Sequence, residues 1–490
     1  MFFHQVFNYF NFYERGKFMI ESRSKNQIVV RGCNKSVTGS TIECSVERSF
    51  YDKFHFLVDY GFYQGAEYQK LKYNSIEHLS KLDAIFLTHN HLDHQGALPL
   101  LVKNGYRNKI YTSIPTSELL SIAYKDTLSI FAEEKQKNKK SKMLYNSGDV
   151  SKTLKLVKPV KFQKTISLGE NLTAILFENQ HLVGSSMILI RSNVYNGDEV
   201  NILFTGDYNN KNSFMDTIDL PEWVYGLKNL TVVIEATYGR TDTSQVEYVW
   251  EENICKACKE GKNILIPCFA QGRYQEILYR IKSLQERGLI PNYYPIFADG
   301  NSGIQYSFSY LQNKKLGIKS DMKDFFPKNV QFVDAKKRSS VLHNLESKII
   351  VTTSGMGGFG PAKLYIPEML HSKEAVIHFS GYTTKGTTGR KLQELEYGEP
   401  ISLNGITIPK KAEVYNTIEF SAHAKADELI KFLNKFRNLR SVLVTHGEPE
   451  IKQRFAERIA RETSVNKIGV LGNGYSYRIG PYGIIKSIQD

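Results

Sequence analysis

The sequence has few cysteines, five in 490 residues, and the number is odd. This argues against a disulfide framework and predicts reduced thiols, as in a cytoplasmic protein. Cys255 and Cys258 have the spacing of a metal-binding pair, but no second pair follows them. We therefore expect these two residues to pack on a helix rather than to bind a metal.

Long apolar runs are also missing. No stretch reaches the roughly 18 apolar residues of a membrane span, so we expect no membrane insertion. The aromatic segment 1–18 lacks the basic start and clean apolar core of a secretion signal. It is either a surface extension, or it precedes a true start at Met19.

Acidic residues are fewer than basic ones, 50 against 64, so the formal net charge is +14. Such an excess favours a polyanionic partner, nucleic acid first and an anionic membrane second. The lysine-rich segment 133–140 is either a solvated loop or an arm that touches RNA.

Hydrophobic residues make up 41% of the chain, which is enough for packed cores, and the length favours two domains. Strand-sized runs at 27–31, 40–46 and 54–59 predict a β-meander. From about residue 240 to 415, strands and helices alternate as in a small parallel-sheet domain. Metal-ligating residue types lie on both sides of this region, which predicts one domain inserted within another.

The densest group of such residues is His89-Asn90-His91-Leu92-Asp93-His94. It lies between a predicted strand, 82–88, and a predicted helix, and α/β proteins tend to place their sites at such strand ends. Imidazole and carboxylate groups are good zinc donors. The structural alternative is a polar loop that is rich in histidine by chance. Three His and one Asp in six positions favour a site for two metal ions.

Four further residues follow predicted strands: Asp59, His181, Asp207 and His446. Each alone is more often a polar residue at a strand end than a ligand. Four of them together, beside the six-residue loop, favour the metal interpretation, with Asp59 as a carboxylate that orients a ligand.

In this order, Asp59, the 89–94 loop, His181 and Asp207 resemble the leading motifs of the metallo-β-lactamase superfamily. Glu235 in Glu235-Ala236-Thr237-Tyr238, His423 and His446 resemble the three further motifs of its β-CASP branch of nucleic-acid nucleases. Segments 266–273, 353–356 and 380–390 are also similar to this branch.

The residue at the last of these motifs separates members of the branch. RNA-cleaving members carry His, as at His446, whereas DNA-processing members carry Val. The form His181-Leu182-Val183-Gly184-Ser185 resembles the group containing the endonuclease subunit of the cleavage and polyadenylation specificity factor. Only 44 residues follow His446, so we expect no additional carboxyl-terminal domain of the RNase J type. We also expect none of the RNA-binding KH modules of the archaeal relatives. His378 departs from the pattern, and we interpret it as a packed or surface residue.

The resemblance implies an α/β fold: a metallo-β-lactamase αββα sandwich with an inserted β-CASP domain of parallel-sheet type. The expected parts are an amino-terminal extension at 1–27, the metallo-β-lactamase domain at 28–238 and 416–490, and the β-CASP domain at 239–415.

The resemblance also implies two Zn²⁺ ions per chain and their ligands. One ion takes His89, His91 and His181, the other takes Asp93, His94 and His446, and Asp207 bridges them. His423 is expected to protonate the leaving oxygen and Glu235 to orient His423, while Asp59 orients a ligand or the bound water. The expected substrate contacts are Arg273, Lys385, Arg390 and Ser421.

The implied function is a zinc-dependent ribonuclease in the cytoplasm, acting in RNA processing or decay. It would hydrolyse single-stranded RNA by a metal-activated hydroxide, as an endonuclease, a 5′–3′ exonuclease or both, and leave 5′-phosphate and 3′-hydroxyl ends. A homodimer is left open. One alternative is a small-molecule hydrolase of the same superfamily, which would not explain the inserted domain or His423. Another is an inactive RNA-binding scaffold, which would be expected to lose ligands.

Overall fold

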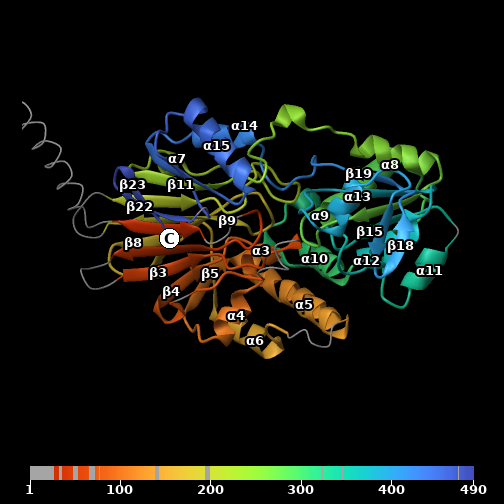
Figure 1. Cartoon of the computed structure of the whole chain (residues 1–490), viewed down its shortest axis with the longest axis horizontal. Coiled ribbons are helices and arrows are strands. Elements are labelled where there is room, and N and C mark those ends of the chain that lie inside the picture. The colour runs from red at the N-terminus through yellow and green to blue at the C-terminus, as the bar shows by residue number, and fades with distance from the viewer. Residues whose placement is uncertain are drawn as a thin grey trace, which may run out of the picture.

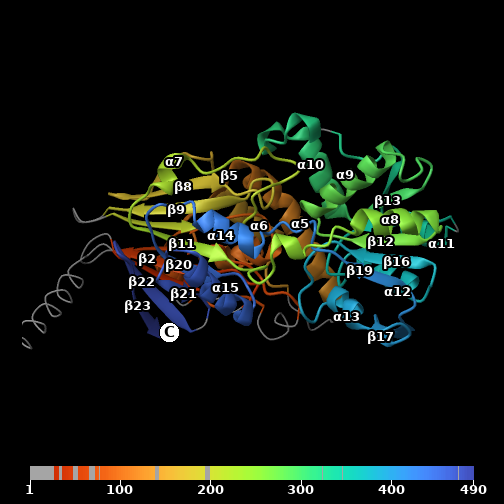
Figure 2. The ribbon, with the colours of Figure 1, turned by 90° about the horizontal axis from the view of Figure 1, so that it is seen from above.

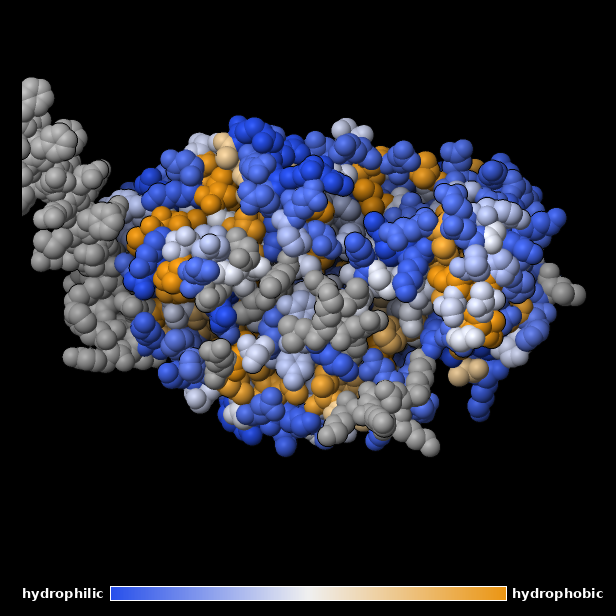
Figure 3. Space-filling view, viewed as in Figure 1, coloured by the Kyte–Doolittle hydropathy of each residue, from blue (hydrophilic) through white to orange (hydrophobic). Residues whose placement is uncertain are grey.

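The computed structural model describes residues 27–32, 36–47, 53–65, 72–76, 78–137, 143–193, 199–322, 324–344, 346–472 and 474–489. Of the expected extension at 1–27, all but Gln27 lies outside these residues. Within them, no helix combines the length and the apolar character needed to cross a membrane. On the face shown in Figure 3, hydrophilic side chains cover most of the surface and apolar ones gather in separate patches.

The first sheet has eight strands in the order β23-β22-β1-β2-β3-β4-β5-β6. Strands β1 to β3 are antiparallel neighbours, which confirms the predicted meander, and β3 to β6 are parallel. The strands are β1 (Ile28–Gly32), β2 (Ile42–Glu47), β3 (Lys53–Val58), β4 (Leu82–Phe86), β5 (Lys109–Ser113), β6 (Val157–Val160), β22 (Tyr475–Gly480) and β23 (Gly483–Gln489).

The second sheet has seven strands in the order β21-β20-β11-β10-β9-β8-β7. It packs face to face on the first sheet: the Phe56 ring from β3 forms edge-to-face pairs with Phe86 of β4 and with Phe204 of β10. Apolar side chains from the two inner faces therefore form one core. The strands are β7 (Thr165–Ser167), β8 (Leu172–Glu178), β9 (Ser186–Ser192), β10 (Val200–Phe204), β11 (Leu230–Glu235), β20 (Leu439–Thr445) and β21 (Ile468–Val470).

Helices cover the outer faces of both sheets and complete a four-layer sandwich (Figure 1). The first sheet is covered by α4 (Leu98–Lys103), α5 (Ile114–Lys137) and α6 (Ser147–Leu156). The second is covered by α7 (Glu222–Tyr225), α14 (Ala426–Leu433) and α15 (Pro449–Glu462). We call these layers the sandwich lobe.

A third sheet has six strands, all parallel, in the order β14-β13-β15-β12-β16-β19. Ile264 and Ile266 of β12 face one core and Leu265 faces another, so the strand is buried on both sides and its sequence is a continuous apolar run. The strands are β12 (Asn263–Pro267), β13 (Ile296–Asp299), β14 (Val330–Val333), β15 (Ile349–Thr352), β16 (Ala375–Phe379) and β19 (Glu413–Asn416).

Around this sheet lie α8 (Trp250–Lys259), α9 (Arg273–Glu286), α10 (Asn301–Gln312), α11 (Arg338–His343), α12 (Ala362–Leu370), α13 (Thr388–Glu394) and the hairpin β17 (Pro400–Leu403) to β18 (Ile406–Pro409). We call this part the inserted lobe, and both ribbon views separate it from the sandwich lobe (Figures 1 and 2). Cys255 and Cys258 lie on α8 as free thiols, and His378 is buried in β16.

The carboxyl-terminal strands complete both sheets of the sandwich lobe. Strand β20 pairs with β11 in the second sheet, and β22 pairs with β1 in the first. The chain therefore leaves the sandwich after β11, builds the parallel sheet and returns. The predicted α/β class is confirmed, whereas the boundaries at 238 and 415 stay predictions.

Candidate metal centre

The parallel pairing of strands brings the polar residues at strand ends together. In the first sheet, Val58 lies beside Phe86, so Asp59 and His89 emerge from neighbouring strand ends. In the second sheet, β10, β11 and β20 are parallel neighbours, so Asp207, Glu235 and His446 emerge at one edge. Because these two edges face each other in the sandwich, residues far apart in sequence share one site.

The histidine-rich loop is held by backbone contacts that require glycine. It continues into the short helix α3 (Leu92–Gln95), and the amide of Tyr60 donates to the carbonyl oxygen of His94 at 2.7 Å. A Cβ atom on Gly61 would lie 1.7 Å from the carbonyl oxygen of Asp93. Only glycine allows this approach, so Gly61 helps to set the position of Asp93 and His94.

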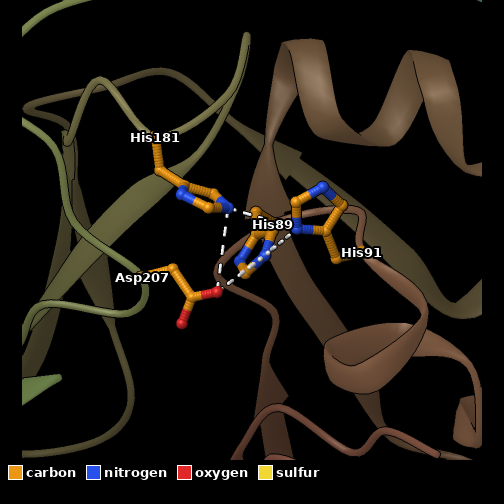
Figure 4. A group of neighbouring side chains, drawn as sticks. All are labelled: His89, His91, His181 and Asp207. Carbon is orange, nitrogen blue, oxygen red and sulfur yellow. Dashed lines mark hydrogen bonds and ion pairs between the residues drawn. The ribbon is translucent and has the colours of Figure 1, made fainter. Parts of the chain in front are cut away.

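Four donor atoms form a first group, drawn in Figure 4. His91 Nδ1 lies 3.2 Å from His89 Nε2 and 3.1 Å from His181 Nε2. Asp207 Oδ2 lies 3.5 Å from His89 Nε2 and 3.7 Å from His181 Nε2. Three imidazoles and one carboxylate thus converge on one point.

A second group lies directly beside the first. His94 Nε2 and His446 Nε2 are 3.2 Å apart, and Asp93 Oδ2 lies 3.7 Å and 3.6 Å from them. Asp207 Oδ2 is also 3.2 Å from His94 Nε2. The carboxylate of Asp207 therefore belongs to both groups.

These separations fit bound cations. In a tetrahedral site with zinc–ligand bonds of about 2.0–2.2 Å, neighbouring donor atoms lie about 3.3–3.6 Å apart. The buried oxygen Oδ1 of Asp207 has no hydrogen-bond partner among the described residues, and His446 Nδ1 lies 3.3 Å from it. A buried carboxylate oxygen is costly unless a cation or a charged imidazole lies close by. The residue types, distances and shared carboxylate together suit two metal ions.

A second set of hydrogen bonds fixes the ring orientations around the first group. Thr88 Oγ1 donates to Asp59 Oδ2 at 2.8 Å, so it accepts from His89 Nδ1 at 2.9 Å. This leaves the His89 Nε2 lone pair directed at the donor group. His181 Nδ1 donates to the carbonyl oxygen of Ala422 at 2.9 Å, with the same result.

The second group is held in the same way. His94 Nδ1 donates to Asp59 Oδ2 at 2.7 Å, and Thr237 Oγ1 lies 3.0 Å from His446 Nδ1. Asp59 thus has the orienting position expected from the sequence. Sequence reasoning missed Thr88 and Thr237, although Thr88 directly precedes the histidine-rich loop and Thr237 lies two residues after Glu235.

The protonation states of the first group suit metal binding. Burial lowers the pKa of His91 to about 4 and lowers the pKa of His89 and of His181 well below the ordinary value. These imidazoles are therefore neutral at pH 7 and can coordinate a cation.

The second group differs because carboxylates surround His94. Burial opposes its charged form, but Asp207, Asp59 and Asp93 outweigh burial and raise the pKa of His94 well above its ordinary value. Burial also opposes the ionised form of Asp207, yet His446 and His94 lower its pKa well below the usual range. The carboxylate of Asp207 is thus available to bridge two cations.

His423 lies at the edge of both groups, with Nε2 4.0 Å from Asp207 Oδ2. Its Nδ1 is 2.8 Å from both carboxylate oxygens of the fully buried Glu235. Burial opposes a charge on His423, but Glu235 outweighs burial and raises the pKa of His423 above its ordinary value. A proton can therefore reside on this imidazole beside the donor groups.

A cavity of about 550 Å³ opens in front of the donor groups and is lined by both lobes. Arg273 at the start of α9 and Ser421 are among its lining residues. Lys385 and Arg390 are exposed and do not line it, although 386–388 do, and Arg390 Nε pairs with Glu394 at 2.7 Å. Substrate contact by any of these four residues stays a prediction.

The inserted lobe is tied directly to the histidine-rich loop. Asn90 Nδ2 donates to Gln271 Oε1 and to the hydroxyl oxygen of Tyr306, each at 3.0 Å. No local sequence pattern indicates this contact, because the partners lie 181 and 216 residues away in the chain. The position of the loop therefore depends on both lobes.

Three family models match consecutive parts of the chain. The metallo-beta-lactamase superfamily domain matches residues 50–234, the Beta-Casp domain matches 274–392, and the Zn-dependent metallo-hydrolase RNA specificity domain matches 407–468.

Curated relatives include the probable RNase MJ4 of Methanocaldococcus jannaschii, 30% identical over 437 residues that cover 86% of this chain and 93% of the relative. The transcription termination factor FttA of Methanosarcina mazei is 28% identical over 413 residues, 80% of this chain and 63% of that protein. The Integrator complex subunit 11 homolog of Dictyostelium discoideum is 28% identical over 409 residues, which cover 79% of this chain and 52% of that protein. The chain thus spans less than two thirds of the length of the latter two.

A solved structure, a protein of unknown function from Enterococcus faecalis V583, has a similar fold. Its TM-score is 0.50 at 12% sequence identity, and the alignment covers 95% of this chain and all of that one.

Proposed function

Because the chain belongs to the β-CASP branch of the metallo-β-lactamase superfamily, we propose that it is a zinc-dependent ribonuclease acting on single-stranded RNA in RNA processing or decay. The family and the two donor groups make it a divalent metal-binding protein. The observation that carries the proposal is His423, held by Glu235 beside both donor groups and facing a cavity between the lobes.

The first Zn²⁺ ion would be held by His89, His91 and His181, and the second by Asp93, His94 and His446, with Asp207 shared. Zinc bound there supplies Lewis acidity and an activated water for attack on phosphorus. Asp59 keeps His94 oriented, and Thr237 does the same for His446.

His423 supplies the proton that the leaving oxygen needs. Its Nδ1 is occupied by Glu235, so Nε2 is the atom that faces the substrate cavity. Protonating the 3′ oxygen of the released fragment leaves a 3′-hydroxyl end on one product and a 5′-phosphate on the other. Arg273, in the cavity wall, offers a planar guanidinium to a phosphate.

The cavity also has surfaces suited to bases. Phe269 and Tyr382 line it and are both partly exposed, whereas the rings of Phe62 and Tyr238 in its wall are buried. Unpaired bases stack on aromatic rings in proteins that bind single strands. Two partly exposed aromatic rings and the guanidinium of Arg273 in the cavity wall therefore support single-stranded RNA as the substrate.

The test is cleavage of 5′-labelled single-stranded RNA by the zinc-loaded protein, with thioester and lactone substrates assayed beside it. His423→Ala should keep its zinc and lose roughly 10²–10⁴-fold in rate, the usual contribution of a general acid. Loss of zinc from this variant would contradict the role of His423, and hydrolysis of thioester or lactone without RNA cleavage would overturn the ribonuclease proposal. The labelled RNA is supplied with either a 5′-triphosphate or a 5′-monophosphate end. Release of mononucleotides would indicate exonuclease action, and discrete fragments would indicate endonuclease action.

A further inference from the structure

Positive charge is concentrated in one part of the sequence. Residues 103–164 contain 14 Lys and Arg against 5 Asp and Glu, a net charge of +9, whereas the whole chain carries +14. About two thirds of the excess charge therefore lies in one eighth of the chain, far from an even distribution.

Five lysines at intervals of three residues form what we call the basic strip: Lys152, Lys155, Lys158, Lys161 and Lys164. The first two lie on α6, the third on β6, and the last two between β6 and β7. All five are exposed. Among the described residues, none of the five forms an ion pair with an acidic side chain. Asp149, the acidic residue of α6, is occupied in the capping box with Asn146.

The position of the strip relates it to the metal centre. Strand β6 is the edge of the first sheet, and it runs parallel to β5 and β4. Lys161 follows the carboxyl end of β6 as the histidine-rich loop follows the carboxyl end of β4, and two strand spacings of about 10 Å in total separate these strands. The strip therefore follows β6, the last strand of the sheet, towards the strand ends that carry the histidine-rich loop. None of its lysines lines the cavity.

Lysines on an edge strand also block pairing with another sheet. That role accounts for Lys158, which lies on β6. It does not account for Lys152 and Lys155 on a helix, or for Lys161 and Lys164 beyond the strand.

The surroundings favour a flexible polyanion over a protein surface. Within the described residues 143–170, no large hydrophobic side chain is exposed. Protein interfaces are depleted in lysine and depend on buried aromatic and apolar anchors. Lysine is a mobile point charge suited to phosphate groups without base recognition.

We propose that the basic strip is a second RNA-contact surface, which holds the sugar–phosphate backbone of a substrate whose cleavage site lies in the cavity. This inference rests on the proposed ribonuclease function. Long RNA should use both surfaces, whereas an oligonucleotide that fits within the cavity should use the cavity alone.

The test compares two variants of the full, zinc-loaded chain. In the strip variant Lys152, Lys155, Lys158, Lys161 and Lys164 become Gln. In the control variant the same change is made at five exposed lysines outside the strip and the cavity: Lys228, Lys314, Lys336, Lys373 and Lys486. Both variants lose the same net charge. Binding of long and short 2′-O-methyl oligouridylates, checked afterwards for intact length, is measured across a range of salt concentrations.

For long RNA, we compare the slope of log K for binding against log salt concentration. This slope should be shallower in the strip variant than in the control variant, by about 0.7 for each lysine that contacts a phosphate and about 3.5 for all five. Short RNA should bind both variants alike. Equal slopes of the two variants for long RNA would overturn the inference. It would also be overturned if the strip variant lost as much affinity for short RNA as for long RNA. Cleavage of short RNA tests the proposed function separately, because it does not involve the strip.

Discussion

Replacing Glu235 by Gln tests how the protein sets the protonation of His423. Glu235 is fully buried, and both of its carboxylate oxygens lie 2.8 Å from His423 Nδ1. The Coulombic attraction and hydrogen bond of this carboxylate are what raise the pKa of His423 against the effect of burial. Gln keeps an oxygen and the size of the side chain, but it removes the negative charge.

The magnitude follows from the cost of losing a hydrogen bond to a charged group. Such a bond contributes about 1.5–3 kcal/mol, and 1.36 kcal/mol corresponds to one pKa unit. The pKa of His423 should therefore fall by about one to two units in Glu235→Gln. A general acid is active when protonated, so activity is lost as pH rises through its pKa. Lowering that pKa should move the alkaline loss of activity to lower pH by the same one to two units.

The assay is kcat/KM for RNA cleavage as a function of pH, with zinc content measured on the same samples. Glu222→Gln, at a surface carboxylate that pairs with Arg437, is the matched control and should leave the profile in place. An alkaline limb that stays where it is, with zinc retained, would refute the assignment of Glu235 and His423 as the proton-donating pair.

Three further outcomes are expected. His446→Ala should retain one zinc equivalent, because His446 is a donor of the second group with Asp93 and His94 and is not among the four donors of the first group, and metal analysis that finds both ions would contradict this. Thr237→Val removes the hydroxyl 3.0 Å from His446 Nδ1 and should weaken the second site by about 10–100-fold in chelator competition, as other outer-sphere changes do; an unchanged affinity would argue against its orienting role. Metal binding to the second group should release a proton, since the raised pKa keeps metal-free His94 protonated at neutral pH, and the apparent affinity there should fall as pH is lowered from neutral. The first group should keep its metal affinity until the pH approaches the pKa of about 4 of His91. Calorimetry in buffers of different ionisation enthalpy measures the proton released when metal binds the second group, and no release would contradict the reasoning.

The parts of the site that local sequence predicted are those that depend on strand ends. Asp59, His181, Asp207 and His446 each follow an apolar strand. Parallel pairing places the ends before Asp59, Asp207 and His446 at the site edge of their sheets, and β8 brings His181 to the same edge because two antiparallel pairings, through β9, give it the direction of β10. The histidine-rich loop was visible for the same reason. A local pattern therefore indicates the ligand residues, because each of them lies where an apolar strand ends.

Contacts between distant segments could not be predicted in this way. Thr237 and His446 are 209 residues apart, and Asn90 and Tyr306 are 216 apart. Hydroxyl and amide side chains are common at surfaces and in turns, so nothing local distinguishes these from others. For the same reason the sequence did not separate Arg273, which lines the cavity, from Lys385 and Arg390, which are exposed outside it.

The central claim is that two donor groups sharing Asp207 hold the ions on which RNA cleavage depends. It is tested most directly by stripping the purified chain with a chelator, removing the chelator, titrating zinc back and following bound metal and cleavage of single-stranded RNA in the same samples. The account predicts two zinc equivalents per chain and cleavage that returns as they bind. Binding of no more than trace zinc, with RNA left intact, would contradict it.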